Sequence, residues 1–209
     1  MCYKSRLTNF SLKAVYLESE PRDRARDHSE DARWVAQCLQ GDLTAFEPLV
    51  RKYERVLFTV ALRLVGDYED ARDTTQVTFL RAYEGLDRYD PNRKFFSWIY
   101  RIAVNECLNV RRGQRPQEAL ADQADTREGP FEALDRAETR ARVEAALMAL
   151  TFEYREVIVL RHFGDLSYEE IAEAVSAEPK TVKSRLFSAR QKLAALLGTA
   201  EEVEVNDVA

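Results

Sequence analysis

Residues 167–193, SYEEIAEAVSAEPKTVKSRLFSARQKL, carry the strongest structural signal in the chain. Ser167 followed three positions later by Glu170 is typical of a capping box, in which each side chain binds a free backbone N–H of the other residue. The segment SAEP, residues 176–179, interrupts this first helix. Proline is tolerated where the next helix begins, because a first-turn N–H has no partner there. The stretch therefore predicts two short helices around a tight turn.

The second of these helices, residues 180–196, is predicted to have one apolar and one basic face. Apolar residues recur at the 3.6-residue spacing of a face packed on a core, namely Val182, Leu186, Ala189, Leu193, Leu196 and Leu197. The opposite face collects Lys180, Lys183, Ser184, Phe187, Ser188 and Gln191, and Arg185, Arg190 and Lys192 flank it. Such a helix can read base edges in a major groove while the flanking cations hold phosphates. The alternative is a helical hairpin with a solvated basic face. We favour DNA reading because the tight turn, the capping box and the one-sided positive charge are all consistent with it.

Composition limits the class of protein. The chain has 209 residues, of which 32% are charged, and a net charge of −5. The negative net charge argues against a protein that coats nucleic acid indiscriminately. The three cysteines are isolated, so we expect a reducing cytoplasm and neither a disulfide framework nor a zinc site. Two distant histidines suggest no metal, and we expect no cofactor. There is no apolar run of membrane length and no recognisable signal peptide, so no membrane insertion is expected.

The first half of the chain predicts a helical core. We expect an N-terminal extension, residues 1–30, that is partly disordered, and folding from about Asp31. Thr44 with Glu47 suggests a second capping box, opening a helix over 45–65. In the next helix, 68–85, the outward face holds Asp70, Asp73, Gln76, Val77, Leu80 and Glu84. Exposed apolar residues rimmed by acids and an amide favour a partner surface, but packing of Val77 and Leu80 on a neighbouring helix is equally compatible.

A further helix over 95–112, FFSWIYRIAVNECLNVRR, mixes aromatic rings with cations. Single-stranded DNA binding uses this mixture, because bases stack on rings while cations follow phosphates. Aromatic residues at helical spacing more often belong to a core, which is the favoured interpretation of this helix taken alone. Residues 113–135 read as an acidic linker, helices resume near Arg136, and the tail 199–209 is expected to be disordered.

Taken together, these runs resemble bacterial RNA polymerase sigma factors of the extracytoplasmic-function (group 4) type. The similarity covers about residues 42–197 and is specific because FFSWIYRIAVN and LSYEEIA…TVKSRLFSAR occur in this order across a linker. It implies an all-α fold of two small helical domains joined by a flexible acidic linker. They would be sigma domain 2 over 31–112 and sigma domain 4 over 136–198, the latter a winged-helix-like four-helix domain with the helix-turn-helix.

The resemblance also implies partners and site residues. The outward surface of 68–85, with Asp70, Asp73, Gln76 and Leu80, would dock on the clamp helices of the largest subunit of core RNA polymerase, and the flap would be a further contact. The −10 element, as single strand, would meet Asn92, Lys94, Ser97, Trp98, Arg101 and Asn105. The −35 duplex would meet Thr181, Lys183, Ser184, Phe187 and Arg190, with Arg185 on phosphate. Promoter DNA and an anti-sigma factor are thus the expected partners besides polymerase.

Three departures from the family pattern bear on function. Val77 stands where the family usually has an acid, so a more apolar polymerase contact is expected. Lys180 stands where glycine is common and Ser188 where Arg or His is common; both lie on the DNA-reading face, so the preferred −35 sequence does not carry over. No nucleophile–base set appears, which favours a non-enzyme. Two rival hypotheses stay open: a helix-turn-helix regulator that binds operators without polymerase, and a sigma-like decoy that occupies a partner without directing transcription.

Overall fold

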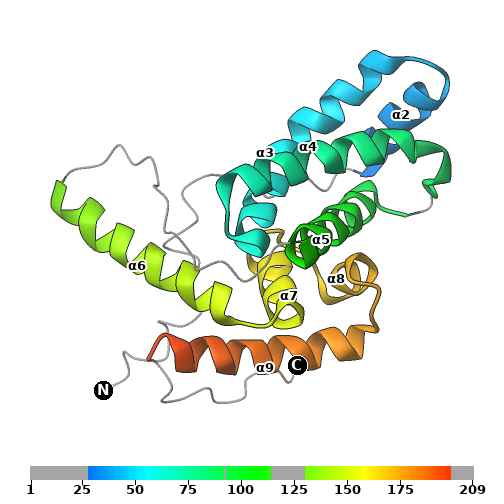
Figure 1. Cartoon of the computed structure of the whole chain (residues 1–209). Helices are drawn as coiled ribbons and strands as arrows, with labels where there is room; N and C mark the ends of the chain where they lie inside the picture. The colour runs from blue at the N-terminus through cyan, green and yellow to red at the C-terminus, as the bar shows by residue number, and fades with distance from the viewer. Residues whose placement is uncertain (1–27, 92, 114–129, 199–209) are drawn as a thin grey trace.

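The computed structural model describes residues 28–91, 93–113 and 130–198, and within these ranges every regular element is a helix. In chain order they are α2 (His28–Leu39), the 3-10 turn η2 (Leu43–Phe46), α3 (Glu47–Val65), α4 (Tyr68–Glu84), the 3-10 turn η3 (Leu86–Arg88), α5 (Phe95–Gly113), α6 (Pro130–Ala149), α7 (Phe152–His162), α8 (Tyr168–Ala174) and α9 (Pro179–Leu196) (Figure 1). The all-α prediction is confirmed. None of these helices is both long and apolar enough to cross a membrane.

The first helix group, α2 to α5, is built around α3. Its apolar positions fall on one face, and the five residues Leu49, Tyr53, Leu57, Val60 and Leu64 are fully buried. Gly66 ends the helix with a φ of +83°, a left-handed conformation that glycine adopts without steric cost. Asp67 then caps α4 by accepting a hydrogen bond from the Asp70 N–H. This sharp reversal packs α4 along α3, and α5 lies against both.

A buried carboxylate fixes α2 on this group. Asp31 is fully buried, and it accepts hydrogen bonds from the Tyr53 hydroxyl at 2.6 Å and the Lys52 ammonium at 2.7 Å. The Lys52 ammonium also lies over the Trp34 ring, 5.7 Å from its centroid. Pairing removes most of the cost of burying the carboxylate, so α2 is held in one orientation on α3.

The second helix group, α6 to α9, contains the predicted helix-turn-helix. Both halves of the capping box are present: the Ser167 hydroxyl accepts from the Glu170 N–H, and the Glu170 carboxylate accepts from the Ser167 N–H. Ser176 turns the chain with a φ of +53°, and Pro179 lies in the first turn of α9. The predicted stripe on α9 is confirmed for Val182, Leu186, Ala189 and Leu193, which are buried against the rest of the group. It is wrong for Leu196, which is 51% exposed in the last turn of the helix.

Some sequence expectations about helix ends and faces are wrong. Thr44 and Glu47 form no capping box; Asp42 caps η2 instead, accepting from both the backbone N–H and the hydroxyl of Thr44. A short acid two residues before Thr44 reaches these donors first, so α3 begins at Glu47.

Helix α6 begins at Pro130, six residues before the expected Arg136. The expectations for 1–27, 114–129 and 199–209 lie outside the described residues.

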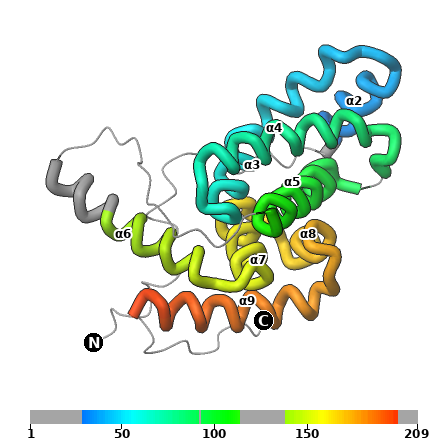
Figure 2. Tube along the Cα trace, in the orientation of Figure 1, coloured from blue at the N-terminus to red at the C-terminus, as the bar shows by residue number. Residues whose placement is uncertain are grey.

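The two helix groups contact each other in this structure. Helix α5 packs against α8, and α3 packs against α6 and α7, so that α5 lies between α4 above and α8 below in the view of Figure 2. One apolar cluster of buried residues runs through both groups.

Candidate nucleic-acid interface

Helix α9 presents its basic face to solvent beside a hollow of about 350 Å³. Thr181, Lys183, Ser184 and Phe187 are all exposed, and Phe187 is 46% exposed. Arg190 is half-buried and lines the hollow. The lining residues are Tyr168, Lys180, Lys183, Ser184, Leu186, Phe187 and Arg190. The structure thus brings most of the sequence-predicted −35 residues together on one surface.

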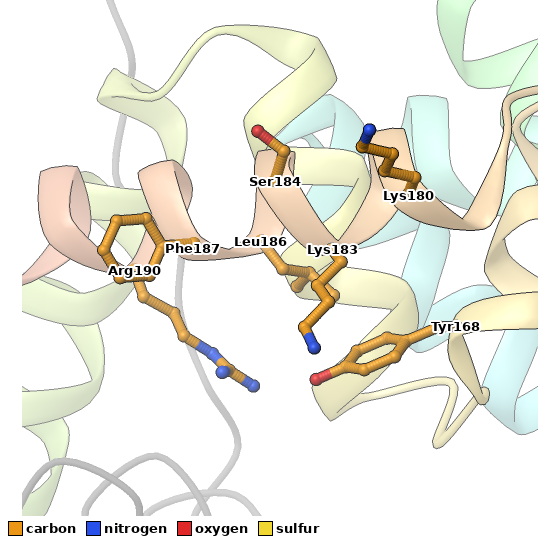
Figure 3. A pocket seen from close by; sticks show the side chains of 7 residues that line it. All are labelled: Tyr168, Lys180, Lys183, Ser184, Leu186, Phe187 and Arg190. Atoms are coloured by element: carbon orange, nitrogen blue, oxygen red, sulfur yellow. The ribbon is translucent and has the colours of Figure 1, made fainter. Parts of the chain in front are cut away.

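The side chains around the hollow point in two directions (Figure 3). The Lys183 ammonium and the Arg190 guanidinium lie on the same side of α9 as the Tyr168 ring, which belongs to α8, whereas Lys180 and Ser184 point to the other side. Tyr168 was missed at the sequence level because it lies in the first turn of a different helix. Only the position of Tyr168 directly after the Ser167 cap could have suggested that its side chain faces the hollow beside α9.

Arg185 is placed differently from its neighbours. One of its guanidinium nitrogens lies 3.4 Å from the Glu156 carboxylate of α7, and its side chain is only 32% exposed. Burial raises the pKa of Glu156 to about 7 even though the Arg185 charge lowers it. The predicted phosphate contact of Arg185 therefore competes with an intramolecular partner, and this residue stands at the edge of the reading face.

The −10 surface predicted on α5 is only partly exposed. Arg101 and Asn105 lie on the open face of the helix, one turn apart. Trp98 is half-buried, and its ring packs 5.4 Å from the Tyr89 ring and 5.6 Å from the Phe95 ring, measured between centroids. Its role is therefore at least in part structural.

Two other predicted −10 residues behave differently from expectation. Ser97 was expected on the outer surface but is only 3% exposed, and its hydroxyl has no hydrogen-bond partner among the residues that the structure describes, so its surface placement is wrong. The family resemblance assigned Ser97 to the DNA surface, whereas α5 is buried around more of its circumference than one helix face, with Phe95, Phe96 and Ser97 all buried in succession. Lys94 is exposed, and its ammonium lies 2.7 Å from the Glu170 carboxylate of α8. Asn92 lies outside the described residues.

The predicted polymerase surface on α4 is open. Leu80 is 57% exposed and Val77 is 36% exposed, so neither packs into the core of the first helix group. Asp73 and Gln76 are exposed beside them, whereas Asp70 is half-buried in the first turn of α4. An apolar pair with acids and an amide around it is the composition of a protein–protein contact.

Within the described residues, no three His, Cys, Asp or Glu side chains lie close enough to hold a metal ion. The arrangement provides charged, aromatic and amide groups on open helix faces, which are binding groups.

Two family models match this chain. Sigma-70 region 2 matches residues 49–117, and Sigma-70 region 4 matches residues 140–193. The first match contains α4 and α5, and the second contains the helix-turn-helix and its hollow.

Curated relatives match over most of their length. RNA polymerase sigma-H factor of Pseudomonas aeruginosa is 34% identical over 177 residues, covering 78% of this chain and 92% of the relative. ECF RNA polymerase sigma factor SigW of Bacillus subtilis is 31% identical over 172 residues, covering 76% and 92%.

Solved structures agree in fold. The structure of CnrH in complex with the cytosolic domain of CnrY matches with a TM-score of 0.65 and 30% identity, covering 83% of this chain and 99% of that one. The sigma factor RpoE from Bartonella quintana, solved with the anti-sigma factor NepR, matches with a TM-score of 0.62 at 22% identity, over 75% and 98%, which supports the fold. This chain therefore belongs to the sigma-70 family and is an alternative RNA polymerase sigma factor of the extracytoplasmic-function group.

Proposed function

We propose that this sigma factor selects promoters by dividing the work between two helices, α9 for the −35 duplex and α5 for unpaired −10 DNA. The observation that carries the proposal is the exposed face of α9, where Phe187 lies among Lys183, Ser184 and Arg190 beside a hollow. A solvated surface rarely keeps a large aromatic ring among cations. A major groove offers such a ring a thymine methyl group and offers the cations phosphates.

On α5, Arg101 and Asn105 are the residues best placed to hold a single strand. They are exposed on one face, and an amide can hydrogen-bond an unstacked base while the guanidinium follows the backbone. The Trp98 ring packs in tilted contacts against two other rings and so supports this face from beneath. Binding energy from both DNA contacts would lower the cost of strand opening, and the chain would act by binding rather than by catalysing a reaction.

The α4 surface is the proposed contact with core polymerase. Leu80 and Val77 would bury their exposed apolar area on the clamp helices of the largest subunit, with Asp73 and Gln76 forming the polar rim. The flap is the proposed partner of the second helix group. Relatives have been solved with CnrY and with the anti-sigma factor NepR, so we include an anti-sigma factor among the partners. We also propose that the chain acts in the cytoplasm, where it would meet core polymerase.

Run-off transcription with purified core polymerase and fragments of the host genome tests the proposal. We expect discrete start sites that require both the polymerase and this chain. No transcript despite co-elution with polymerase would favour the decoy hypothesis. Operator binding without any polymerase dependence would favour the ordinary regulator.

A triple variant tests the α9 surface. Replacing Lys183, Ser184 and Phe187 with alanine is expected to abolish promoter selection and to leave helicity and polymerase binding intact, because all three side chains are exposed. A matched control replaces three exposed α2 residues of similar kind, Arg33, Gln37 and Leu39, and is expected to transcribe normally. Unchanged start sites in the first variant would refute the assignment of α9.

A further inference from the structure

A continuous apolar patch lies on the outer side of α4 and extends onto η2. Val77, Leu80 and Tyr83 follow one another at three-residue steps, so their side chains are neighbours on the helix surface. The Tyr83 ring lies 5.2 Å from the Phe46 ring, measured between centroids, which brings η2 against α4. Leu43 precedes Phe46 by three residues in a 3-10 turn and therefore lies on the same side of that turn. We call Leu43, Val77, Leu80 and Tyr83 the α4 patch.

The α4 patch holds much of the apolar surface that the fold leaves open. Its four members are between 36% and 65% exposed, and they are half of the eight large apolar side chains that are exposed among the described residues. The patch is also wider than the proposed polymerase contact, which does not include Leu43 or Tyr83. A cluster of this kind on a folded chain indicates that something covers it.

Acidic side chains surround the α4 patch. Asp73 and Glu84 are exposed on α4, and Asp87 is exposed in η3. Glu84 forms no ion pair with any residue that the structure describes. The Arg81 guanidinium on the same helix is already paired, because it lies 3.0 Å from the Glu106 carboxylate of α5. The α4 patch therefore fits a partner that is both apolar and basic.

The first residues of this chain have that composition. Residues 1–17, MCYKSRLTNFSLKAVYL, contain the cations Lys4, Arg6 and Lys13 and no acid, in a chain whose net charge is −5. The same residues include large aliphatic and aromatic side chains, namely Leu7, Phe10, Leu12, Val15 and Leu17. These residues lie outside the described part of the chain, and their sequence combines the two properties that the α4 patch requires.

Residues 1–17 are within reach of the α4 patch. Burial raises the pKa of the Tyr89 hydroxyl to about 12 and the Asp31 charge adds to it, which places the first turn of α2 close to the residues that follow α4. Helix α2 packs against η3, and Figure 1 shows α2 beside the end of α4 that leads to α5. Leu80 lies six residues before η3, which is about 9 Å along α4. Residues 18–27, which join the segment to α2, span up to about 35 Å when extended.

We propose that residues 1–17 bind the α4 patch in the free chain and so cover the surface that core polymerase uses. The apolar side chains of the segment pack on the patch, and its three cations face Asp73, Glu84 and Asp87. The inference rests on the proposed function, since it takes α4 as the polymerase contact. Polymerase has to displace the segment, so its apparent affinity is reduced by the fraction of chains in which the patch is open.

Paramagnetic labelling of the intact chain detects this contact. Under native conditions a thiol-reactive nitroxide is expected to attach to Cys2, because Cys38 and Cys107 are buried. The amide signals of α4 around Leu80 should then broaden, whereas those of α9 around Phe187 should not. Reduction of the nitroxide should restore the broadened signals. Full intensity around Leu80 in the free labelled chain would overturn the proposal.

A mixed sample distinguishes a second copy of the chain as the occupant of the α4 patch. When the nitroxide and the isotope are on different chains, only an intermolecular contact broadens the Leu80 signal. We expect no broadening in an equal mixture of the two. Broadening as strong as in the doubly labelled chain would assign the patch to a second copy and overturn the proposal.

Charge reversal in the segment tests its effect on polymerase binding. The triple variant Lys4→Glu/Arg6→Glu/Lys13→Glu is expected to lose the broadening around Leu80 and to bind core polymerase roughly three- to tenfold more tightly. A matched control reverses the three cations of residues 18–27, Arg22, Arg24 and Arg26. It changes the net charge by the same amount and should change neither value.

A compensating change on α4 completes the test. Adding Glu84→Lys to the triple variant places a cation opposite the new acids and should restore part of the broadening. Unchanged polymerase affinity in the triple variant would overturn the proposal, and so would weaker binding, because the segment itself would then contact polymerase. Failure of the proposed function is a separate result: the wild-type chain would not bind core polymerase, whatever the broadening around Leu80.

Discussion

Glu156 is expected to make the fold less stable as the pH rises through neutrality. This carboxyl lies on α7 with its side chain 9% exposed, and its charged neighbours are Arg185 on α9 and Glu153 on its own helix. Burial raises its pKa from 4.5 to about 7, and the Glu153 charge adds to this, while Arg185 opposes it. The folded chain therefore holds this proton between pH 4.5 and 7, where the unfolded chain has lost it.

The sign and size follow from proton linkage. Because the folded state binds more protons in this window, the free energy of unfolding falls as the pH rises, by at most about 1.4 kcal/mol per pH unit. The stabilisation is fully present below pH 4.5 and is lost as the pH passes through 7. Summed over the window, the loss is on the order of 3 kcal/mol.

Glu156→Gln isolates this contribution. Glutamine resembles the protonated carboxyl in shape, cannot ionise, and keeps an oxygen that can accept from Arg185. Urea unfolding of both proteins from pH 5 to 8.5 should give a difference that grows with pH, with the variant more stable at pH 8.5 by on the order of 2–3 kcal/mol. Other titrating groups are common to both chains and cancel. A pH-independent difference, or a variant less stable at pH 8.5, would refute the reasoning.

Three further predictions concern stability and reactivity. Ser167→Ala removes the α8 cap and should cost about 1 kcal/mol of unfolding free energy, measured by urea unfolding; a change no larger than that of the exposed Ser184→Ala would contradict it. Leu186→Ala should cost about 2–5 kcal/mol while its neighbour Phe187→Ala costs under about 1 kcal/mol in the same assay, because Leu186 is buried and Phe187 is not; equal losses would exclude the observed rotation of α9. Burial raises the pKa of the Cys107 thiol to about 12, so in a Cys2→Ser/Cys38→Ser chain this thiol should react with a disulfide reagent at pH 8 only after unfolding, and rapid reaction of the folded chain would count against its burial.

Local sequence patterns were enough for the helix-turn-helix. The Ser167–Glu170 cap, the Pro179 start and the α9 stripe all depend on residues within four positions of each other, which is the range over which helical periodicity and capping act. The same local rule failed at Thr44, because Asp42 competes for the same backbone donor.

Contacts between distant residues were not predictable in this way. Ser97 was assigned to an open face, but the arc of α5 that is buried depends on whether α8 packs on it. Arg185 was assigned to phosphate, but Glu156, which is 29 positions away, holds it. Lys94 pairs with a residue 76 positions later. These pairings produce no regular pattern in the sequence, because the separation between the two partners along the chain is not set by helical geometry.

Local spacing along the chain was sufficient to predict the all-α class, the family, and most of the residues that face outward on α9 and α4. Spacing along a single helix decides these features, since each residue's direction follows from the 100° turn per position. Which of the outward faces remain exposed depends instead on how the helices pack in three dimensions. Phe96, Tyr100 and Val104 are buried on α5, a helix that packs against α8 as well as α3 and α4. Arg155, Arg63 and Lys94 join the two helix groups through partners far away in the chain. Long-range packing and the pairing of buried charges determine which helix faces are buried, and both depend on the whole fold.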